Sequence, residues 1–262
     1  MDIASILGII LGVLTLIVGM IAKGASPSAL VNPAALIIIF VGTFSAILVA
    51  FPFRDLKKFP SLLKTIFTTQ NTMTETELVD FFVDKANITK REGILGLQKG
   101  LEDIQEPFLK KGIELILEGK TSEDIENILY QEIDAREERH SGYSSIFTLA
   151  GSFAPTLGVL GAVIGLISAL GNLNDMDKLG HSIAAAFVAT LYGIFTGYVL
   201  MHPMANKLKR KSKQEILIAN IAITGILALQ EGSSAMTIKS KLMPYLPQSA
   251  QRESGESDGQ TS

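Results

Sequence analysis

Four long apolar runs alternate with charge-dense stretches along this chain of 262 residues. The first two runs cover about Ile3–Ala22 and Pro33–Phe53, and the other two lie within Ser145–Pro203. Each run reaches the ~20 residues that a helix needs to cross the hydrocarbon core of a bilayer. The first run follows Asp2 instead of a basic leader, so we interpret it as a retained helix and not as a signal peptide. The pattern predicts four membrane-spanning helices in two hairpins.

Between the hairpins the chain is polar and charged, and its apolar positions recur every three or four residues, which predicts helices. A capping box is expected at Thr74, because Glu77 follows three positions later, and Ser122 is a candidate N-cap. The fold class is therefore an all-α, polytopic membrane protein with a helical domain between spans two and three. In chain order we expect a membrane hairpin at 1–53, this helical domain at 54–144, a second membrane hairpin at 145–203, C-terminal helices at 204–247, and a polar, disordered tail at 248–262.

Basic residues gather after the second and fourth spans and are sparse in the two opposite links. The clusters are Arg54, Lys57, Lys58 and Lys64 after span two, and Lys207, Lys209, Arg210, Lys211 and Lys213 after span four. The opposite links contain only Lys23 and Lys178 as basic residues. Because basic loops stay on the cytoplasmic side, this distribution predicts a cytoplasmic helical domain and two cytoplasmic termini.

Composition narrows the possible chemistry. The net charge is only -3, so nucleic acid is not an expected partner. The chain has no cysteine, which excludes disulfides and thiolate metal sites, and its three histidines are far apart in sequence. We also find no nucleophile motif or phosphate loop. We therefore expect no enzyme activity, no metal and no cofactor.

The second hairpin combines small residues with a lack of acidic side chains in its apolar runs. The small residues form two stripes, which are Gly158, Gly161, Ala162, Gly165 and Ala169 in span three, and Ala186, Ala189, Thr190, Gly193 and Gly197 in span four. Small residues let helices approach closely, and packing within one chain explains any single pair of them. Two stripes on adjacent spans favour an oligomer interface or a central cavity.

Hydroxyls and prolines are the other distinctive groups of this hairpin. Thr156 and Thr190 either bond to the carbonyl one turn back, as membrane threonines commonly do, or face a polar path. Pro155 frees a backbone carbonyl and can kink its helix, and Pro203 lies near the end of span four. Intramembrane carboxylates are the usual proton carriers. Since these spans have none, a partner must supply the carrier if the protein conducts protons.

The stretch PTLGVLGAVIGLISAL, followed by LGHSIAAAFVATLYGIFTGYVLMHPMANKLKRKS, closely resembles the MotA family of flagellar stator subunits. The resemblance also covers NPAALIIIFVGTFSAILVAFP in span two and KREGILGLQKGLED in the helical domain. The wider MotA/TolQ/ExbB proton channel group shares only the last two spans and a cytoplasmic domain, so the first hairpin favours the motor branch. A TolQ/ExbB-type subunit that energises envelope transport is the alternative.

The resemblance implies a non-enzymatic subunit of the bacterial cytoplasmic membrane that couples ion flow to torque. Members form a homopentamer around two copies of a single-span MotB-type partner, which binds peptidoglycan and carries the ion on a membrane aspartate. Their cytoplasmic domain acts on the rotor protein FliG. Around them lies membrane lipid.

The family's functional positions map onto the second hairpin. By resemblance, Pro155 and Pro203 match two prolines that couple ion flow to conformational change, and Thr190 matches the hydroxyl that faces the partner's aspartate. We place Thr156 on the same ion path. Sodium-driven relatives have a threonine at the position of Ala162, and proton-driven ones have a small apolar residue. The resemblance therefore implies H+ rather than Na+ as the coupling ion.

The family's rotor contacts map onto the helical domain. Lys90 and Arg91 match its basic contact with the rotor, although a solvated helix face is the simpler interpretation of two such residues. The acidic contact falls at Gln98, which is neutral here, and Glu102 and Asp103 lie about one turn further on and could substitute for it.

Overall fold

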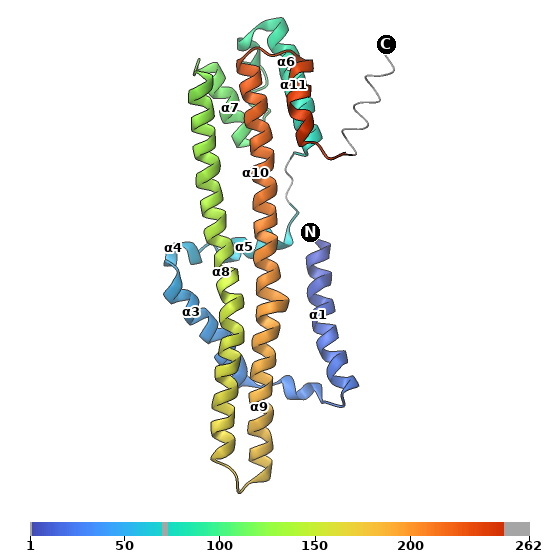
Figure 1. Cartoon of the computed structure of the whole chain (residues 1–262), viewed down its shortest axis with the longest axis vertical. Coiled ribbons are helices and arrows are strands. Elements are labelled where there is room, and N and C mark those ends of the chain that lie inside the picture. The colour runs from blue at the N-terminus through green and yellow to red at the C-terminus, as the bar shows by residue number, and fades with distance from the viewer. Residues whose placement is uncertain (1, 70–72, 249–262) are drawn as a thin grey trace. The chain divides into compact units, whose positions relative to one another are not determined.

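The computed structural model describes residues 2–69 and 73–248, and every regular element in this part of the chain is a helix (Figure 1). The chain forms two compact units, which are Met1–Gln70 with Arg139–Arg210, and Asn71–Glu138 with Lys211–Ser262. We call them the membrane unit and the helical unit. Each is discontinuous in sequence because α8 (Ser122–Leu170) and α10 (His202–Gln230) contribute residues to both.

Four helical segments within the described residues are long and apolar enough to cross a membrane, which confirms the predicted spans. They are Ile3–Ala22, Pro33–Ala50, Ser122–Leu170 and Met176–Gln230. The last two are much longer than a bilayer requires, so no helix end marks the predicted boundaries at 144 and 203. The predicted tail lies, apart from Gln248, outside the described residues.

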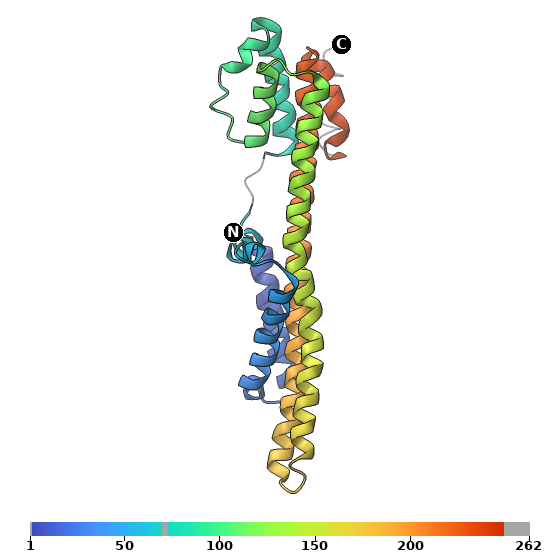
Figure 2. The ribbon, with the colours of Figure 1, turned by 90° about the vertical axis from the view of Figure 1, so that its left-hand side faces the viewer.

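The membrane unit is built on α8 and α9 (Met176–Ile194), which run side by side (Figure 1). Span one is α1 (Ile3–Ala22), and span two comprises α2 (Pro33–Leu36), the π-helix η2 (Ile37–Val41) and α3 (Gly42–Ala50). Short helices η1 (Pro27–Leu30), α4 (Phe53–Leu56) and α5 (Phe59–Phe67) complete the first half of the unit. Both of the first two spans lie on the same side of the α8–α9 pair, so its other face is left uncovered by them (Figure 2).

Glycine sets the distance between α8 and α9. A Cβ added at Gly193 would lie 2.5 Å from the Ala154 carbonyl oxygen, and one at Gly158 would lie 3.0 Å from the Ala189 carbonyl oxygen. Further along the pair, a Cβ at Gly165 would lie 3.0 Å from the Ser182 carbonyl oxygen. The two small-residue stripes therefore pack against each other within one chain. For these glycines the structure shows packing within the chain, and an oligomer interface or cavity along the two stripes stays a prediction.

Helix α9 continues through η4 (Phe195–Met201), a seven-residue π-helix, into α10. Pro203 lies just beyond η4 and has no N–H, so it cannot donate to a carbonyl in the preceding turn. The wider turns of η4 accommodate that missing bond without ending the helix. This is why the chain stays helical through a proline that the sequence places at the end of span four.

The helical unit has a single apolar core that combines residues 78–133 with residues 218–246. Its described elements are α6 (Glu75–Glu92), η3 (Ile94–Gln98), α7 (Pro107–Leu117), the first part of α8, the second part of α10, α11 (Ala235–Leu242) and η5 (Met243–Tyr245). Fully buried side chains such as Phe82, Ile113 and Ile226 come from three of these helices. The segments that we separated in sequence at 54–144 and 204–247 therefore share a core, whereas α5 packs in the membrane unit.

Side-chain caps begin two helices of this unit. At α6 the Thr74 hydroxyl accepts from the Glu77 backbone N–H, and the Glu77 carboxylate accepts from the Thr74 N–H, which confirms the predicted capping box. At α8 the predicted cap is wrong by one position. Thr121, not Ser122, accepts from the Asp124 N–H at 3.1 Å, and its hydroxyl donates back to the Asp124 carboxylate.

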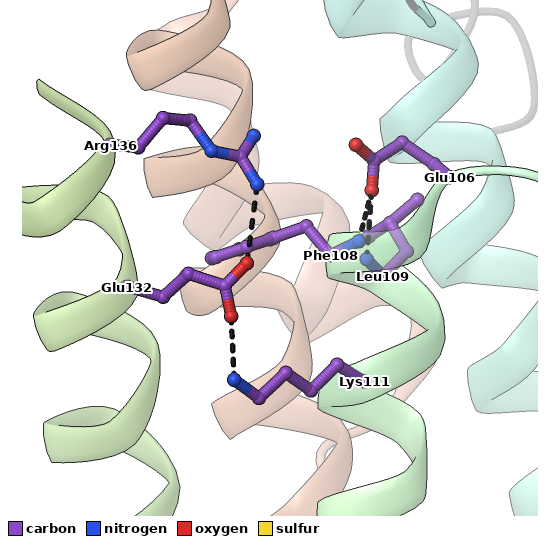
Figure 3. A network of polar contacts seen from close by, with 6 residues as sticks. All are labelled: Glu106, Phe108, Leu109, Lys111, Glu132 and Arg136. Atoms are coloured by element: carbon purple, nitrogen blue, oxygen red, sulfur yellow. Dashed lines mark hydrogen bonds and ion pairs between the residues drawn. The ribbon is translucent and has the colours of Figure 1, made fainter. Parts of the chain in front are cut away.

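An ion-pair network fastens α7 to α8 in the helical unit (Figure 3). The Glu132 carboxylate accepts from the Lys111 ammonium at 2.6 Å and from the Arg136 guanidinium at 3.2 Å. The same guanidinium lies 5.6 Å from the centre of the buried Phe108 ring. Arg136 therefore combines a cation–π contact with Phe108 and an ion pair with Glu132.

The α8–α9 contact predicts a position-specific cost for one methyl group. We expect Gly193→Ala to lower the free energy of unfolding by about 1–3 kcal/mol, because the new Cβ would overlap the Ala154 carbonyl oxygen. Gly180→Ala, on the same helix, is the matched control, since its Cβ would meet nothing within 4 Å. Denaturant unfolding of both variants in detergent micelles measures the difference, and equal stability would contradict this packing.

Candidate ion path and rotor-binding surface

Thr190 lies on α9 where that helix meets α8. Its hydroxyl oxygen is 3.3 Å from the Ala186 carbonyl oxygen one turn back and 3.5 Å from the Gly158 carbonyl oxygen on α8. A hydroxyl has one proton to donate, so it bonds to one of these carbonyls at a time, and its oxygen can still accept a hydrogen bond. Thr190 as a whole is half-buried.

Pro155 lies inside α8 and contacts two glycines of span four, Gly193 in α9 and Gly197 in η4. A Cβ at Gly193 would lie 3.1 Å from the Pro155 Cα, and one at Gly197 would lie 2.8 Å from the Pro155 Cγ. Pro155 has no N–H for the Gly151 carbonyl, which is the normal partner one turn back. That carbonyl oxygen would lie 2.5 Å from a Cβ at Gly197, in the π-helix η4. The carbonyl freed by the proline thus abuts the irregular part of span four.

The remaining predicted ion-path residues lie on α8. Thr156 is exposed, and its hydroxyl donates to the Phe153 carbonyl oxygen at 2.7 Å. Ala162 is half-buried, one turn beyond Gly158. The structure therefore brings Pro155 and Thr190 together at the α8–α9 contact through their glycine neighbours, whereas Thr156 bonds to its own helix.

Ionisable carboxylates and bases other than histidine are absent from the described helical residues 145–170 and 179–201. In the connecting link the Asp175 carboxylate accepts from the Lys178 backbone N–H, which caps α9, and forms an ion pair with the Lys178 ammonium at 3.0 Å. The described residues also contain no group of three or more histidine or acidic side chains that could hold a metal ion. Apart from His181, hydroxyls and backbone carbonyls are the polar groups that the described residues 145–170 and 179–201 offer to an ion.

Two buried hydroxyls within spans two and four were missed by sequence analysis. Thr43 and Thr196 are 8% and 3% exposed, and the Thr43 oxygen has no hydrogen-bond partner among the described residues. A threonine in a regular helix would donate to the carbonyl four residues back, at Ile39. Ile39 lies in the π-helix η2, which changes that register. The apolar sequence of η2 carries no signal for a π-turn, so this site could not be found from sequence.

The candidate rotor-binding residues lie at the end of α6 and in the segment after it. Lys90 and Arg91 are exposed in the last turn of α6, and the Arg91 Nε donates to the Asn87 carbonyl oxygen at 3.3 Å. Cations in this position are stabilised by the partial negative charge of the helix C-terminus. Gln98 ends η3 and is also exposed, so the three side chains are available to a partner.

Lysines of this chain engage the acids around Gln98. The Lys99 ammonium donates to the Glu92 carboxylate at 2.8 Å and holds the pKa of that carboxyl below its usual value. The Lys110 ammonium donates to the Glu102 carboxylate at 3.1 Å. Glu102 is therefore already paired, which weakens it as a substitute for an acid at position 98. Asp103, next to it, is exposed.

Comparison with known proteins places these features in one family. The sequence profile of the MotA/TolQ/ExbB proton channel family matches residues 101–220. Motility protein A of Bacillus subtilis (strain 168) is 51% identical over 247 residues, which are 94% of this chain and 92% of that protein. The structure of the flagellar MotAB stator complex from Bacillus subtilis matches with a TM-score of 0.90 at 49% identity, over 95% of this chain and 97% of the other. The structure of C. jejuni MotAB matches with a TM-score of 0.89 at 27% identity and the same coverage.

These matches decide between the two branches left open by sequence. The profile matches residues 101–220, whereas the matches to Motility protein A and to MotAB cover 94% and 95% of this chain and so include the first hairpin. They agree with a stator subunit and give no support to the envelope-transport or enzyme alternatives. The chain belongs to the MotA/TolQ/ExbB proton channel family, and within it to the motility protein A subunits of the flagellar stator.

Proposed function

We propose that this stator subunit couples proton flow across the bacterial cytoplasmic membrane to torque, together with a single-span MotB-type partner that supplies the proton-carrying aspartate. The observation that carries the proposal is that residues 145–170 of α8 and 179–201 of α9 and η4 contain no carboxylate, although a threonine hydroxyl lies at the contact between these helices. A proton path needs a titratable carrier, and these residues include no aspartate or glutamate that could serve as one.

The proposed assembly is a homopentamer around two MotB-type chains, with both termini and the helical unit in the cytoplasm. The basic clusters after spans two and four support this orientation. Large apolar side chains on α8 and α9 are exposed in the single chain, including Val159, Ile167 and Phe187. They are suited to contact neighbouring copies, the partner helix and membrane lipid.

In the proposed cycle, protonation of the partner's aspartate beside Thr190 removes a charge from a low-dielectric site. Each proton that crosses releases ~2.3 kcal/mol per 100 mV of membrane potential. Pro155 and Pro203 are the proposed points of conformational coupling, because both interrupt the regular α-helical bonding near η4. Thr156 and Ala162 complete the proposed path on α8.

The first test concerns the coupling ion. Ala162 offers no oxygen to replace the hydration shell of a sodium ion, so we expect swimming of the wild type to stop when a protonophore collapses the proton gradient, whatever the sodium concentration. Swimming speed of wild type and Ala162→Thr cells is measured with and without sodium, each in the presence and in the absence of the protonophore. If both strains swim equally well on sodium alone, proton coupling is refuted.

The second test concerns the proposed FliG contact. Lys90→Glu with Arg91→Glu reverses two exposed charges, so we expect at least a tenfold smaller swarming area with unchanged amounts of protein in the membrane. Lys120→Glu is the matched control, because Lys120 is exposed in the same unit but lies outside the proposed contact. Unchanged motility of the double variant would remove these residues from the rotor interface.

A further inference from the structure

An apolar groove opens in the membrane unit between α1 and the segment where η4 joins α10. It has a volume of about 450 Å³ and is lined mostly by apolar side chains, such as Ile9, Ile66, Phe67, Val199, Leu200 and Met204. Gly8 also lines it, and a Cβ added there would meet nothing within 4 Å. Side chains of the described residues therefore do not pack against α1 at Gly8, and the groove is open there.

One end of the groove is polar. Ser5, in the first turn of α1, lines it together with Lys207 of α10. The Lys207 ammonium donates to the Ser5 hydroxyl oxygen at 2.8 Å and forms an ion pair with Asp2. An ammonium group has three N–H donors, so these two contacts leave one for a further acceptor. The side chain of Lys207 is 29% exposed, which makes that donor accessible.

The surroundings of this polar end are strongly basic. The segments 2–9, 51–69 and 198–210, which supply the groove and its flanks, contain seven lysines and arginines but only two acids. Clusters of basic residues next to a membrane span attract anionic lipid headgroups. An apolar trough that ends at a lysine in such a cluster matches a molecule with an acyl chain and a negatively charged phosphate.

We propose that this groove binds an anionic glycerophospholipid, with one acyl chain along Gly8 and Val199 and the phosphate at Lys207 and Ser5. The bound lipid fills the space between span one and span four and holds the two together where η4 ends. The placement of this lipid in the cytoplasmic leaflet rests on the proposed topology, whereas its binding does not. The competing occupant is a helix from a second copy of the chain.

Site-specific photo-crosslinking tests the proposal, because the sequence contains no cysteine. Gly8→Cys, labelled with benzophenone maleimide, is placed in nanodiscs that contain equal amounts of phosphatidylglycerol and phosphatidylcholine, and adducts are identified by mass spectrometry. We expect phosphatidylglycerol adducts to exceed phosphatidylcholine adducts about fivefold, the effect of one lysine charge near the headgroup. Lys207→Gln in the same background should reduce the excess to near parity.

Leu14→Cys is the matched control, since Leu14 lies on the same helix α1 and is exposed. It lies more than two helical turns from both Ser5 and Lys23, so its lipid adducts should show no headgroup preference. Crosslinks from position 8 to a second copy of the chain, in place of lipid, would overturn the proposal. So would equal labelling of the two lipids at position 8, or a phosphatidylglycerol excess that persists in Lys207→Gln.

Discussion

The close approach of α8 and α9 is the constraint on which the membrane unit depends. Lipid surrounds membrane helices with apolar chains, so their association rests on packing and on satisfied backbone groups. Here that packing uses Gly158 and Gly193, whose missing side chains bring one helix against the backbone of the other. The contact has no room for a carboxylate. The feature that joins the two helices therefore agrees with the proposal that another chain supplies the proton carrier.

The irregular bonding of span four lies beside this contact. Gly197, in the π-helix η4, meets the carbonyl that Pro155 frees on α8, and the His202 ring packs over Gly151, where a Cβ would lie 2.9 Å from it. Helical bonds are already displaced or missing here, so rearrangement costs less than in a regular helix. In the proposed cycle we therefore expect motion driven by protonation of the partner's aspartate beside Thr190 to be taken up between Pro155 and Pro203.

The sequence predicted what depends on local pattern. Four apolar runs predicted four spans, and Thr74 with Glu77 predicted a capping box, because each signal lies within a few turns of chain. The sequence could not show that Thr121 rather than Ser122 caps α8, since the cap is defined by the hydrogen bond from the Asp124 N–H. The π-helix η2 that precedes Thr43 and the π-helix η4 that contains Thr196 leave no mark in apolar sequence. The shared core of the helical unit depends on contacts between segments far apart in the sequence, which local pattern does not predict. The small-residue stripes are compatible with packing against several different helices, and only the structure shows which helix faces them within the chain.

The central claim is that the proton carrier belongs to another chain. Proton flux into liposomes under an imposed membrane potential tests it most directly, with this chain reconstituted alone and together with a MotB-type partner. Our account predicts no flux above that of empty liposomes for the chain alone, and flux with the partner that disappears when the partner's membrane aspartate is replaced by asparagine. Proton conduction by the chain alone would contradict it.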